Sequence, residues 1–161
     1  MQICYINLDS NTRRRQRIDW QLAELGLEAT RISATTPADI APALLAEYCP
    51  GTSRIPLSPP ELACTLSHLA ALEKIAGGSE PFGLILEDDA LLSRTLPAFL
   101  SDFEKSRPNL DLIKLDSSGD TVRGLYRRAI SVAGITLVQV VTDRDCSAAY
   151  IISRRAAEQI S

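Results

Sequence analysis

Three consecutive acidic residues, Glu87-Asp88-Asp89, follow directly on the apolar run 82–86. Neighbouring carboxylates repel one another, so a cluster of this kind needs a partner that neutralises it. Side chains alternate along an extended chain, which predicts that Glu87 and Asp89 point to one side and Asp88 to the other. Two carboxylates separated by one residue are typical ligands of a hard divalent cation. Water molecules and phosphate oxygens usually complete the coordination of such an ion. Solvated acids in a strand-to-loop turn are the alternative interpretation.

Basic side chains gather at the start of a predicted helix, in the run Thr12-Arg13-Arg14-Arg15. The amino end of a helix carries partial positive charge, which makes it an unfavourable place for cations. Because helix amino ends also bind phosphate, the run indicates an anionic partner at this helix. A solvated basic face is the alternative interpretation.

The single histidine, His68, lies on a helix that the capping box 58–61 is expected to begin. Glu61, Cys64 and His68 are spaced i, i+3 and i+7 and therefore share one face of that helix. Cys64 and His68 by themselves do not define a metal site. The pair Ser67-His68 fits contact with a phosphate or a sugar, and a structural histidine fits the same sequence.

Further carboxylates could accept a proton from a substrate. They are Asp116, at the end of the predicted strand 111–115, and the pair Asp143 and Asp145. Solvated surface acids would give the same pattern.

The elements that must position these residues alternate between strand and helix. Strands are predicted at 2–8, 28–33, 82–86, 111–115, 132–141 (one or two strands) and 150–152, and helices from 12 to the stop at Gly26, at 43–48, 58–77 and 96–105, and after a cap at Ser153. This order predicts an α/β fold with a mainly parallel sheet flanked by helices, which binds ligands beyond the carboxyl ends of its strands. The acidic triplet stands at such an end.

Composition bounds the class of protein. The chain has 161 residues, the size of one domain, with 45% hydrophobic and 23% charged residues and a net charge of −3. These values exclude a disordered or coiled-coil chain and give no basic footprint for binding a nucleic-acid backbone. No secretory signal precedes the first predicted strand, and the weakly polar stretch 129–141 is too short to span a bilayer. The four cysteines have no C-x-x-C or zinc-site spacing, so we expect a cytoplasmic protein with reduced thiols.

Four blocks in order along the chain resemble glycosyltransferase family 25, which includes lipooligosaccharide and collagen galactosyltransferases. They are Tyr5-Ile6-Asn7-Leu8-Asp9 with Arg14-Arg15; the run 57–68 with Glu61, Cys64 and Ser67-His68; the run 84–90 with the acidic triplet; and the run 149–157 with Tyr150 and Ser153-Arg154-Arg155. The chain departs from the family pattern at Ala63 and Ala149, where glycine is usual, and at Leu72, where an aromatic residue is common.

The resemblance implies a GT-A type nucleotide-sugar-binding fold. It implies transfer of a hexose, here galactose, from a UDP-sugar donor to a saccharide or glycolipid acceptor of lipopolysaccharide biosynthesis, with peripheral membrane association. Mn²⁺ (or Mg²⁺) is expected at Glu87 and Asp89, and Asp116 and Asp145 are the candidates for the base of an inverting displacement. The residues expected to contact the donor are Asn7, Leu8, Asp9, Arg14, Arg15, Ser67, His68 and Asp88.

In the family, the last block normally precedes further sequence on the acceptor side, so we expect residues 1–161 to be a donor-binding core with an incomplete acceptor site. Two other classes of protein are alternatives. A non-catalytic nucleotide-sugar-binding module would keep the same motifs. A response-regulator receiver would use the acidic run with Asp116 as phosphoacceptor, but too few residues separate Asp89 from Asp116, and too few follow, for the repeated units of that fold.

Overall fold

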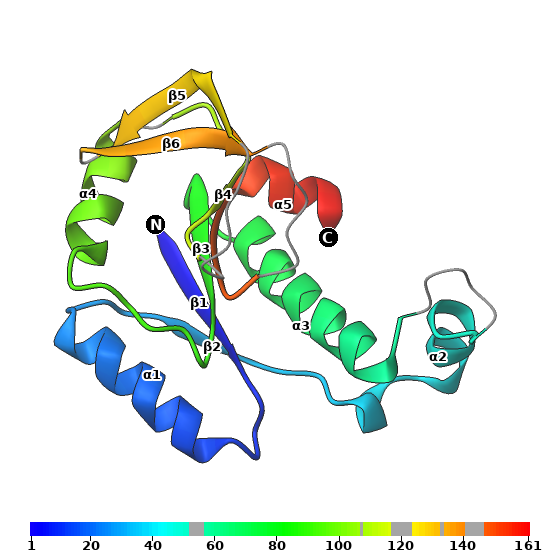
Figure 1. Cartoon of the computed structure of the whole chain (residues 1–161). Coiled ribbons are helices and arrows are strands. Elements are labelled where there is room, and N and C mark those ends of the chain that lie inside the picture. Colours follow the sequence, from blue (N-terminus) through cyan, green and yellow to red (C-terminus); the bar gives the residue numbers. More distant parts are fainter. Residues whose placement is uncertain (52–56, 107, 117–123, 133, 141–146) are drawn as a thin grey trace.

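The computed structural model describes residues 1–51, 57–106, 108–116, 124–132, 134–140 and 147–161. The strands of its main sheet are β1 (Gln2–Asn7), β2 (Thr30–Ser33), β3 (Phe82–Glu87), β4 (Leu112–Lys114) and β7 (Ala149–Ser153). The helices are α1 (Thr12–Glu24), α2 (Pro42–Tyr48), α3 (Pro59–Ala76), α4 (Leu96–Ser106) and α5 (Arg154–Ile160), with a 3-10 turn η1 (Pro37–Asp39). The sheet has the order β2-β1-β3-β7-β4 and lies between helices (Figure 1).

The sheet is mixed, with one strand reversed. β1 pairs in parallel with β2 and β3, whereas β7 lies antiparallel between β3 and β4. The other four strands run in one direction, so the predicted α/β fold with a mainly parallel sheet flanked by helices is confirmed. Because β7 is reversed, its first residues lie at the same edge as the carboxyl ends of β3 and β4.

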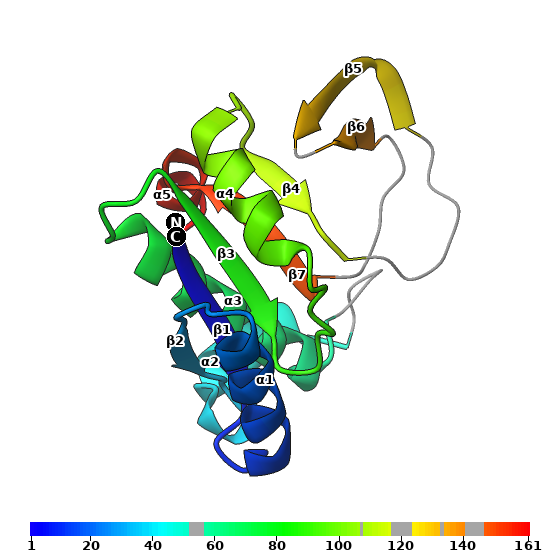
Figure 2. The ribbon, with the colours of Figure 1, turned by 90° about the vertical axis from the view of Figure 1, so that its left-hand side faces the viewer.

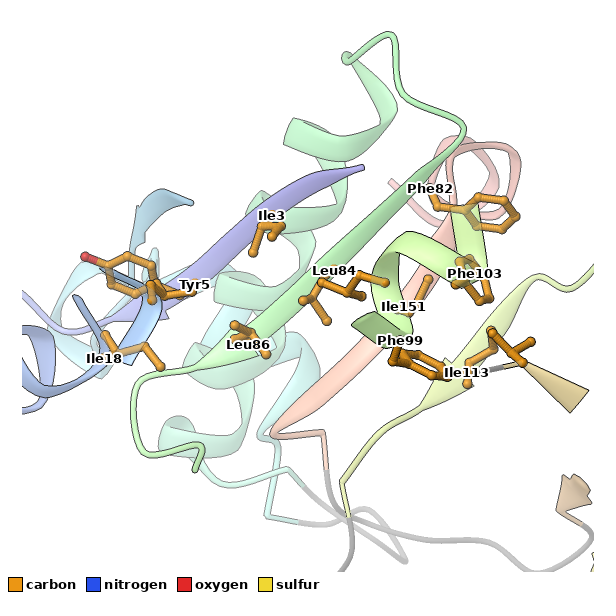
Figure 3. Close-up of a cluster of buried hydrophobic side chains, with 13 residues drawn as sticks. Ile3, Tyr5, Ile18, Phe82, Leu84, Leu86, Phe99, Phe103, Ile113 and Ile151 are labelled. Carbon is orange, nitrogen blue, oxygen red and sulfur yellow. The ribbon is translucent and has the colours of Figure 1, made fainter. Parts of the chain in front are cut away.

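Strand side chains alternate between two apolar layers on opposite faces of the sheet. In Figure 1, α1 and α4 lie on one side of the sheet, and α3 and α5 lie on the other. Figure 3 shows the layer on the α1 and α4 side, built from residues that include Ile3, Tyr5, Ile18, Leu84, Leu86, Phe99 and Phe103. The other layer includes Cys4, Ile6, Leu72, Ile75, Ile85, Tyr150 and Ala157.

A separate antiparallel hairpin consists of β5 (Gly124–Val132) and β6 (Ile135–Val140). It lies on the β4 side of the molecule (Figure 2), and buried Val132 packs into the layer that contains α4. The sequence predicted strand only from residue 132 onward. The larger part of β5 was missed because Arg127-Arg128 interrupts the apolar pattern.

Local sequence sets the helix boundaries. The predicted capping box of α3 is confirmed: the Ser58 N–H donates to the Glu61 carboxylate at 2.7 Å, and the Glu61 N–H donates to Ser58 Oγ at 3.4 Å. Ser153 caps α5 as predicted, accepting from the Ala156 N–H at 3.1 Å. Gly26 follows α1 with a φ of 64°, a left-handed conformation that glycine adopts without strain. None of the helices in the described part of the chain is both long enough and apolar enough to cross a membrane.

Candidate functional site at the carboxyl edge of the sheet

The acidic triplet is divided between the two faces of the sheet. Glu87 is the last residue of β3 and continues the side of Ile85, so it faces α3. Asp88 continues the side of Leu86 and faces the start of α1. The predicted opposition of these two side chains is therefore confirmed, and each meets a different set of partners.

On the α1 face, Asn7 and Arg14 hold Asp88. Asn7 is 2% exposed and Asp88 is 7% exposed. Asn7 Nδ2 donates to Asp88 Oδ2 at 2.7 Å, and Arg14 Nη1 donates to Asp88 Oδ1 at 3.2 Å. The same Arg14 nitrogen lies 3.1 Å from Asp89 Oδ2. One guanidinium thus pairs with two adjacent carboxylates and offsets one of their two negative charges, which reduces their mutual repulsion.

Asp89 does not share a side with Glu87, so this part of the predicted alternation is wrong. β3 ends at Glu87, and the Ala90 N–H donates to the Glu87 carbonyl at 3.2 Å, which turns the chain at Asp88-Asp89. Alternation is a property of extended backbone and ends with the strand. Asp89 consequently lies beside Asp88 at Arg14, with 44% of its side chain exposed.

On the α3 face, Glu87 contacts side chains from α3 and from the segment that enters β7. Ser147 Oγ donates to Glu87 Oε1 at 3.1 Å, and His68 Nε2 lies 3.3 Å from the same oxygen. His68 Nδ1 lies 3.0 Å from Tyr150 Oη, and the two rings stack with centroids 5.7 Å apart. Helix α3, strand β3 and the segment that enters β7 therefore fix the orientation of the imidazole.

Cys64 lies one helical turn before His68 on α3. Its Sγ, a ring nitrogen of His68 and a carboxylate oxygen of Glu87 all lie within 4.8 Å of one another. Within the described ranges, these residues are the one group of three or more histidine, cysteine and acidic side chains that converges closely enough to hold a metal ion. The sequence predicted the shared helix face of Cys64 and His68 but not the approach of Glu87.

The charges on the α3 face follow from these contacts. Hydrogen bonds from His68 and Ser147 hold the pKa of Glu87 below its usual value, although its partial burial acts in the opposite direction. Burial raises the pKa of Cys64 and of Tyr150, and the negative charge of Glu87 raises both further. At neutral pH, Glu87 is therefore the ionised member, and the thiol and the phenol keep their protons.

Other residues expected to contact the donor lie at the end of β1. Asp9 pairs with Arg31 and accepts from Ser33 Oγ at 2.9 Å, and these contacts lower the pKa of Asp9. Leu8 is 38% exposed. Arg15 is half-buried, and its charge also acts on Asp9. The structure thus brings these residues to the same edge as Asn7 and Arg14.

Ser67, also expected to contact the donor, is 2% exposed. Its Oγ donates to the Ala63 carbonyl at 2.8 Å and accepts from the Thr35 N–H at 2.9 Å. These bonds tie α3 to the segment after β2, so the hydroxyl has a structural role. A donor contact by Ser67 stays a prediction that its burial does not support.

Of the two candidates for the base, Asp116 lies in the described part of the chain. Asp116 follows β4, has 9% of its side chain exposed and accepts from the Ala148 N–H at 2.9 Å. It therefore joins the end of β4 to the entrance of β7, at the edge that carries Glu87. Asp145 and its neighbour Asp143 lie outside the described residues.

Three residues of these networks were missed by the sequence prediction. Arg31 Nε donates to Asn7 Oδ1 at 3.1 Å, and Ser147 and Tyr150 contact Glu87 and His68. Tyr150 lies in one of the four blocks that resemble the family, so the sequence did contain a signal that could have identified it. Ser147 and Arg31 have no distinguishing sequence signal, because their roles depend on which strands become neighbours.

An α/β sheet with charged side chains at the carboxyl edge of its strands is the arrangement of the nucleotide-binding α/β enzymes. The profile of glycosyltransferase family 25, described as an LPS biosynthesis protein family, matches residues 1–161. The chain therefore belongs to glycosyltransferase family 25, and the resemblance carried by the four blocks is confirmed.

The chain is also similar to individual bacterial proteins named for lipooligosaccharide or lacto-N-neotetraose biosynthesis. It is 25% identical over 167 residues to the lipooligosaccharide biosynthesis protein lic2B of Haemophilus influenzae, covering 100% of this chain and 63% of that protein. It is 27% identical over 162 residues to the lacto-N-neotetraose biosynthesis glycosyltransferase LgtB of Neisseria gonorrhoeae, covering 97% and 58%. The chain thus spans about three fifths of the length of the curated relatives it matches.

Proposed function

We propose that residues 1–161 form the donor-binding domain, of GT-A type, of a glycosyltransferase that moves galactose from UDP-galactose to a saccharide of lipooligosaccharide. The observation that carries the proposal is the meeting of Asn7, Asp88 and Arg14 at the carboxyl edge of the sheet, in a chain that belongs to family 25. The relatives are named for lipooligosaccharide and lacto-N-neotetraose biosynthesis, which supports a saccharide or glycolipid acceptor.

Arg14 is the residue proposed to bind the donor diphosphate. Its side chain is 49% exposed, and a guanidinium offers five N–H donors in a planar fork that matches phosphate oxygens. Asp88 and Asn7 lie behind it and fix its direction. Leu8, Asp9 and Arg15 flank this position, and we assign them to binding of the nucleotide. His68 lies on the opposite face of the sheet, on α3, where it contacts Glu87.

Glu87 and Asp89 are the proposed ligands of Mn²⁺ or Mg²⁺. Carboxylate oxygens suit a hard divalent cation, and the two side chains are 31% and 44% exposed at the edge of the sheet. Because Glu87 faces α3 and Asp89 faces Arg14, one of the two side chains must turn toward the other to bind the same ion. Arg14 already pairs with Asp89, so a cation there must share that carboxylate with the guanidinium or displace it. When bound, such a metal offsets the charge that develops on the departing diphosphate.

The transfer itself needs a carboxylate base, which we assign to Asp116 or Asp145. The acceptor hydroxyl oxygen forms a bond to the anomeric carbon, the bond from that carbon to the UDP oxygen breaks, and the base takes the hydroxyl proton. Asp116 Oδ1 lies 3.9 Å from Lys114 Nζ, and its other oxygen accepts from the Ala148 N–H. These two contacts fix the position of the Asp116 carboxylate at the edge of the sheet that carries Glu87.

The metal assignment is tested by Asp89→Asn. Calorimetry with UDP in the presence of Mn²⁺ should give an affinity at least about tenfold weaker than in the wild type, because the metal loses a charged ligand. Without metal, Asp89→Asn should bind UDP at least as tightly as the wild type, because Arg14 loses a competing carboxylate, whereas Arg14→Gln should weaken UDP binding with and without Mn²⁺. Asp102→Asn, an exposed acid on α4, is the matched control. Unchanged Mn²⁺-dependent binding in Asp89→Asn would contradict the assignment.

An activity assay on the wild-type protein distinguishes a glycosyltransferase from a non-catalytic nucleotide-sugar-binding module. Incubation with UDP-galactose and galactose, glucose or N-acetylglucosamine acceptors should release UDP. Binding of UDP-galactose without hydrolysis or transfer by this chain would instead indicate a non-catalytic nucleotide-sugar-binding module.

We further propose a cytoplasmic location at the inner face of the membrane, with α1 as the contact. Arg13, Arg17 and Trp20 are exposed and spaced i, i+4 and i+7, so they share one face of α1. Trp20 is 64% exposed. Gln21 bonds to the backbone of Ala90 and Leu92 and thereby holds a loop with the exposed side chain of Leu91 against the same helix. Basic and aromatic side chains together are typical of helices at an anionic lipid surface.

A further inference from the structure

We propose that Cys64, His68 and Glu87 form a second metal site, which takes a borderline transition metal such as Zn²⁺. The three residues offer one sulfur, one nitrogen and one oxygen, and these atoms lie within 4.8 Å of one another. Zinc sites use this ligand chemistry, with a Zn–S distance of about 2.3 Å and Zn–N and Zn–O distances of about 2.0–2.2 Å.

Two rigid elements carry the ligands. Cys64 and His68 are four residues apart on α3, so successive turns of one helix present them on the same side. Glu87 comes from the end of β3, a strand buried along its whole length up to this residue. Helix α3 and strand β3 pack against each other through the apolar layer that they share. The ligand atoms therefore converge without any loop having to become ordered.

Tyr150 supplies the outer contact that a metal-bound histidine needs. Its Oη lies 3.0 Å from His68 Nδ1, while His68 Nε2 faces Glu87 Oε1 at 3.3 Å. When Nδ1–H donates to Tyr150, Nε2 keeps its lone pair for a metal, and the ring orientation is already fixed. In the metal-free protein Nε2–H donates to Glu87, so metal binding at Nε2 requires the imidazole to carry its proton on Nδ1 instead.

Glu87 belongs both to this site and to the proposed Mn²⁺ site, but the other donors distinguish the two sites. Thiolate and imidazole ligands favour zinc, cobalt and related ions, whereas Mn²⁺ and Mg²⁺ prefer oxygen. Cys64 is exposed, so an ion can enter from solvent, and three protein ligands leave a fourth position for water. Bound metal would join α3 to the end of the strand that carries the acidic triplet.

Cobalt is the probe that tests the site, because its spectrum reports the ligand atoms. Titration of the reduced full chain with Co²⁺ should produce a thiolate-to-cobalt charge-transfer band in the near ultraviolet. Zn²⁺ should abolish this band by competition, and should raise the melting temperature. Cys64→Ser should lose the band, and His68→Asn and Glu87→Gln should weaken Co²⁺ binding at least about tenfold.

Controls separate this proposal from the donor site. Cys49→Ser and Cys146→Ser remove other thiols and should keep the band. Asp89→Asn should also keep it, although the same substitution should weaken Mn²⁺-dependent UDP binding. Circular dichroism of each metal-free variant verifies that it is folded. A cobalt spectrum without the thiolate band, a band that persists in Cys64→Ser, or a band lost in Asp89→Asn would each overturn the proposal.

Discussion

Asn7 is the buried side chain on which the charged residues of the α1 face depend. Its Nδ2 donates to Asp88 and to the Asn11 carbonyl, and its Oδ1 accepts from Arg31. One neutral amide thus connects an anion that follows β3 with a cation on β2. Asn7 and Arg14 bond to different oxygens of the same Asp88 carboxylate.

We predict that Asn7→Ala destabilises the protein far more than the small number of side-chain atoms removed implies. The substitution leaves hydrogen-bonding groups of Asp88 and Arg31 unsatisfied at a buried position, and the free energy of unfolding should fall by about 3 kcal/mol. Urea denaturation at pH 7 measures it. Asn11→Ala, which removes the exposed cap of α1, should lower the same quantity by only about 1 kcal/mol. Equal losses in the two variants would contradict the role given to Asn7.

Part of this residue-scale picture was predictable from sequence. The adjacent carboxylates predicted a cationic partner, and the unfavourable position of Arg14 at a helix start predicted an anionic one. The structure shows that Arg14 and the carboxylates of Asp88 and Asp89 are partners of each other. Arg31 and Ser147 were not predictable, because their contacts depend on the pairing of β2 with β1 and of β7 with β3. Asp89 was misplaced because the end of β3 cannot be read to the residue from an apolar run.

At the scale of elements, α3 packs very closely on β3 through Gly83. A Cβ atom added at Gly83 would lie 2.6 Å from Ile75 Cγ1 and 2.8 Å from Ile75 Cγ2, closer than side chains approach one another. The absence of a side chain at this position therefore sets the distance between the helix that carries His68 and the strand that ends in Glu87. The geometry of the α3 face depends on this contact.

We predict that Gly83→Ala lowers the free energy of unfolding by about 2 kcal/mol, because it overpacks this contact. Ile75→Ala alone should be destabilising through the cavity that it leaves. The double variant should be more stable than the sum of the two effects by at least about 1 kcal/mol, since the smaller side chain makes room for the new methyl group. A double-mutant cycle by urea denaturation measures this coupling, and strict additivity would contradict it.

Most elements were predictable, but the direction of one strand was not. The apolar run 150–152 predicted a strand and Ser153 predicted the following helix start, and both are confirmed. An apolar run has no direction, however, so nothing in the residues indicated that β7 enters the sheet antiparallel between β3 and β4. That reversal brings Ser147 and Tyr150 to the site.

At the scale of the whole molecule, the net charge of −3 conceals an uneven distribution. Four arginines lie within the first six residues of α1, and two of them are on its outer face with Trp20. A chain that is acidic overall can therefore still present a basic, partly aromatic surface to an anionic membrane. Net charge alone does not exclude a lipid partner, because surface charges act over about a Debye length, roughly 10 Å.

We predict that the protein binds vesicles containing phosphatidylglycerol and not vesicles of phosphatidylcholine alone. Trp20 is the only tryptophan of the chain, so its fluorescence should shift to shorter wavelength on binding. Arg13→Glu with Arg17→Glu should weaken binding at least about tenfold, because each basic residue near the surface contributes about 1 kcal/mol. Added salt should weaken wild-type binding as well. Lys74→Glu with Arg154→Glu changes the net charge equally on the α3 and α5 side and is the matched control. Equal losses in the two double variants would show that overall charge, and not the outer face of α1, governs binding.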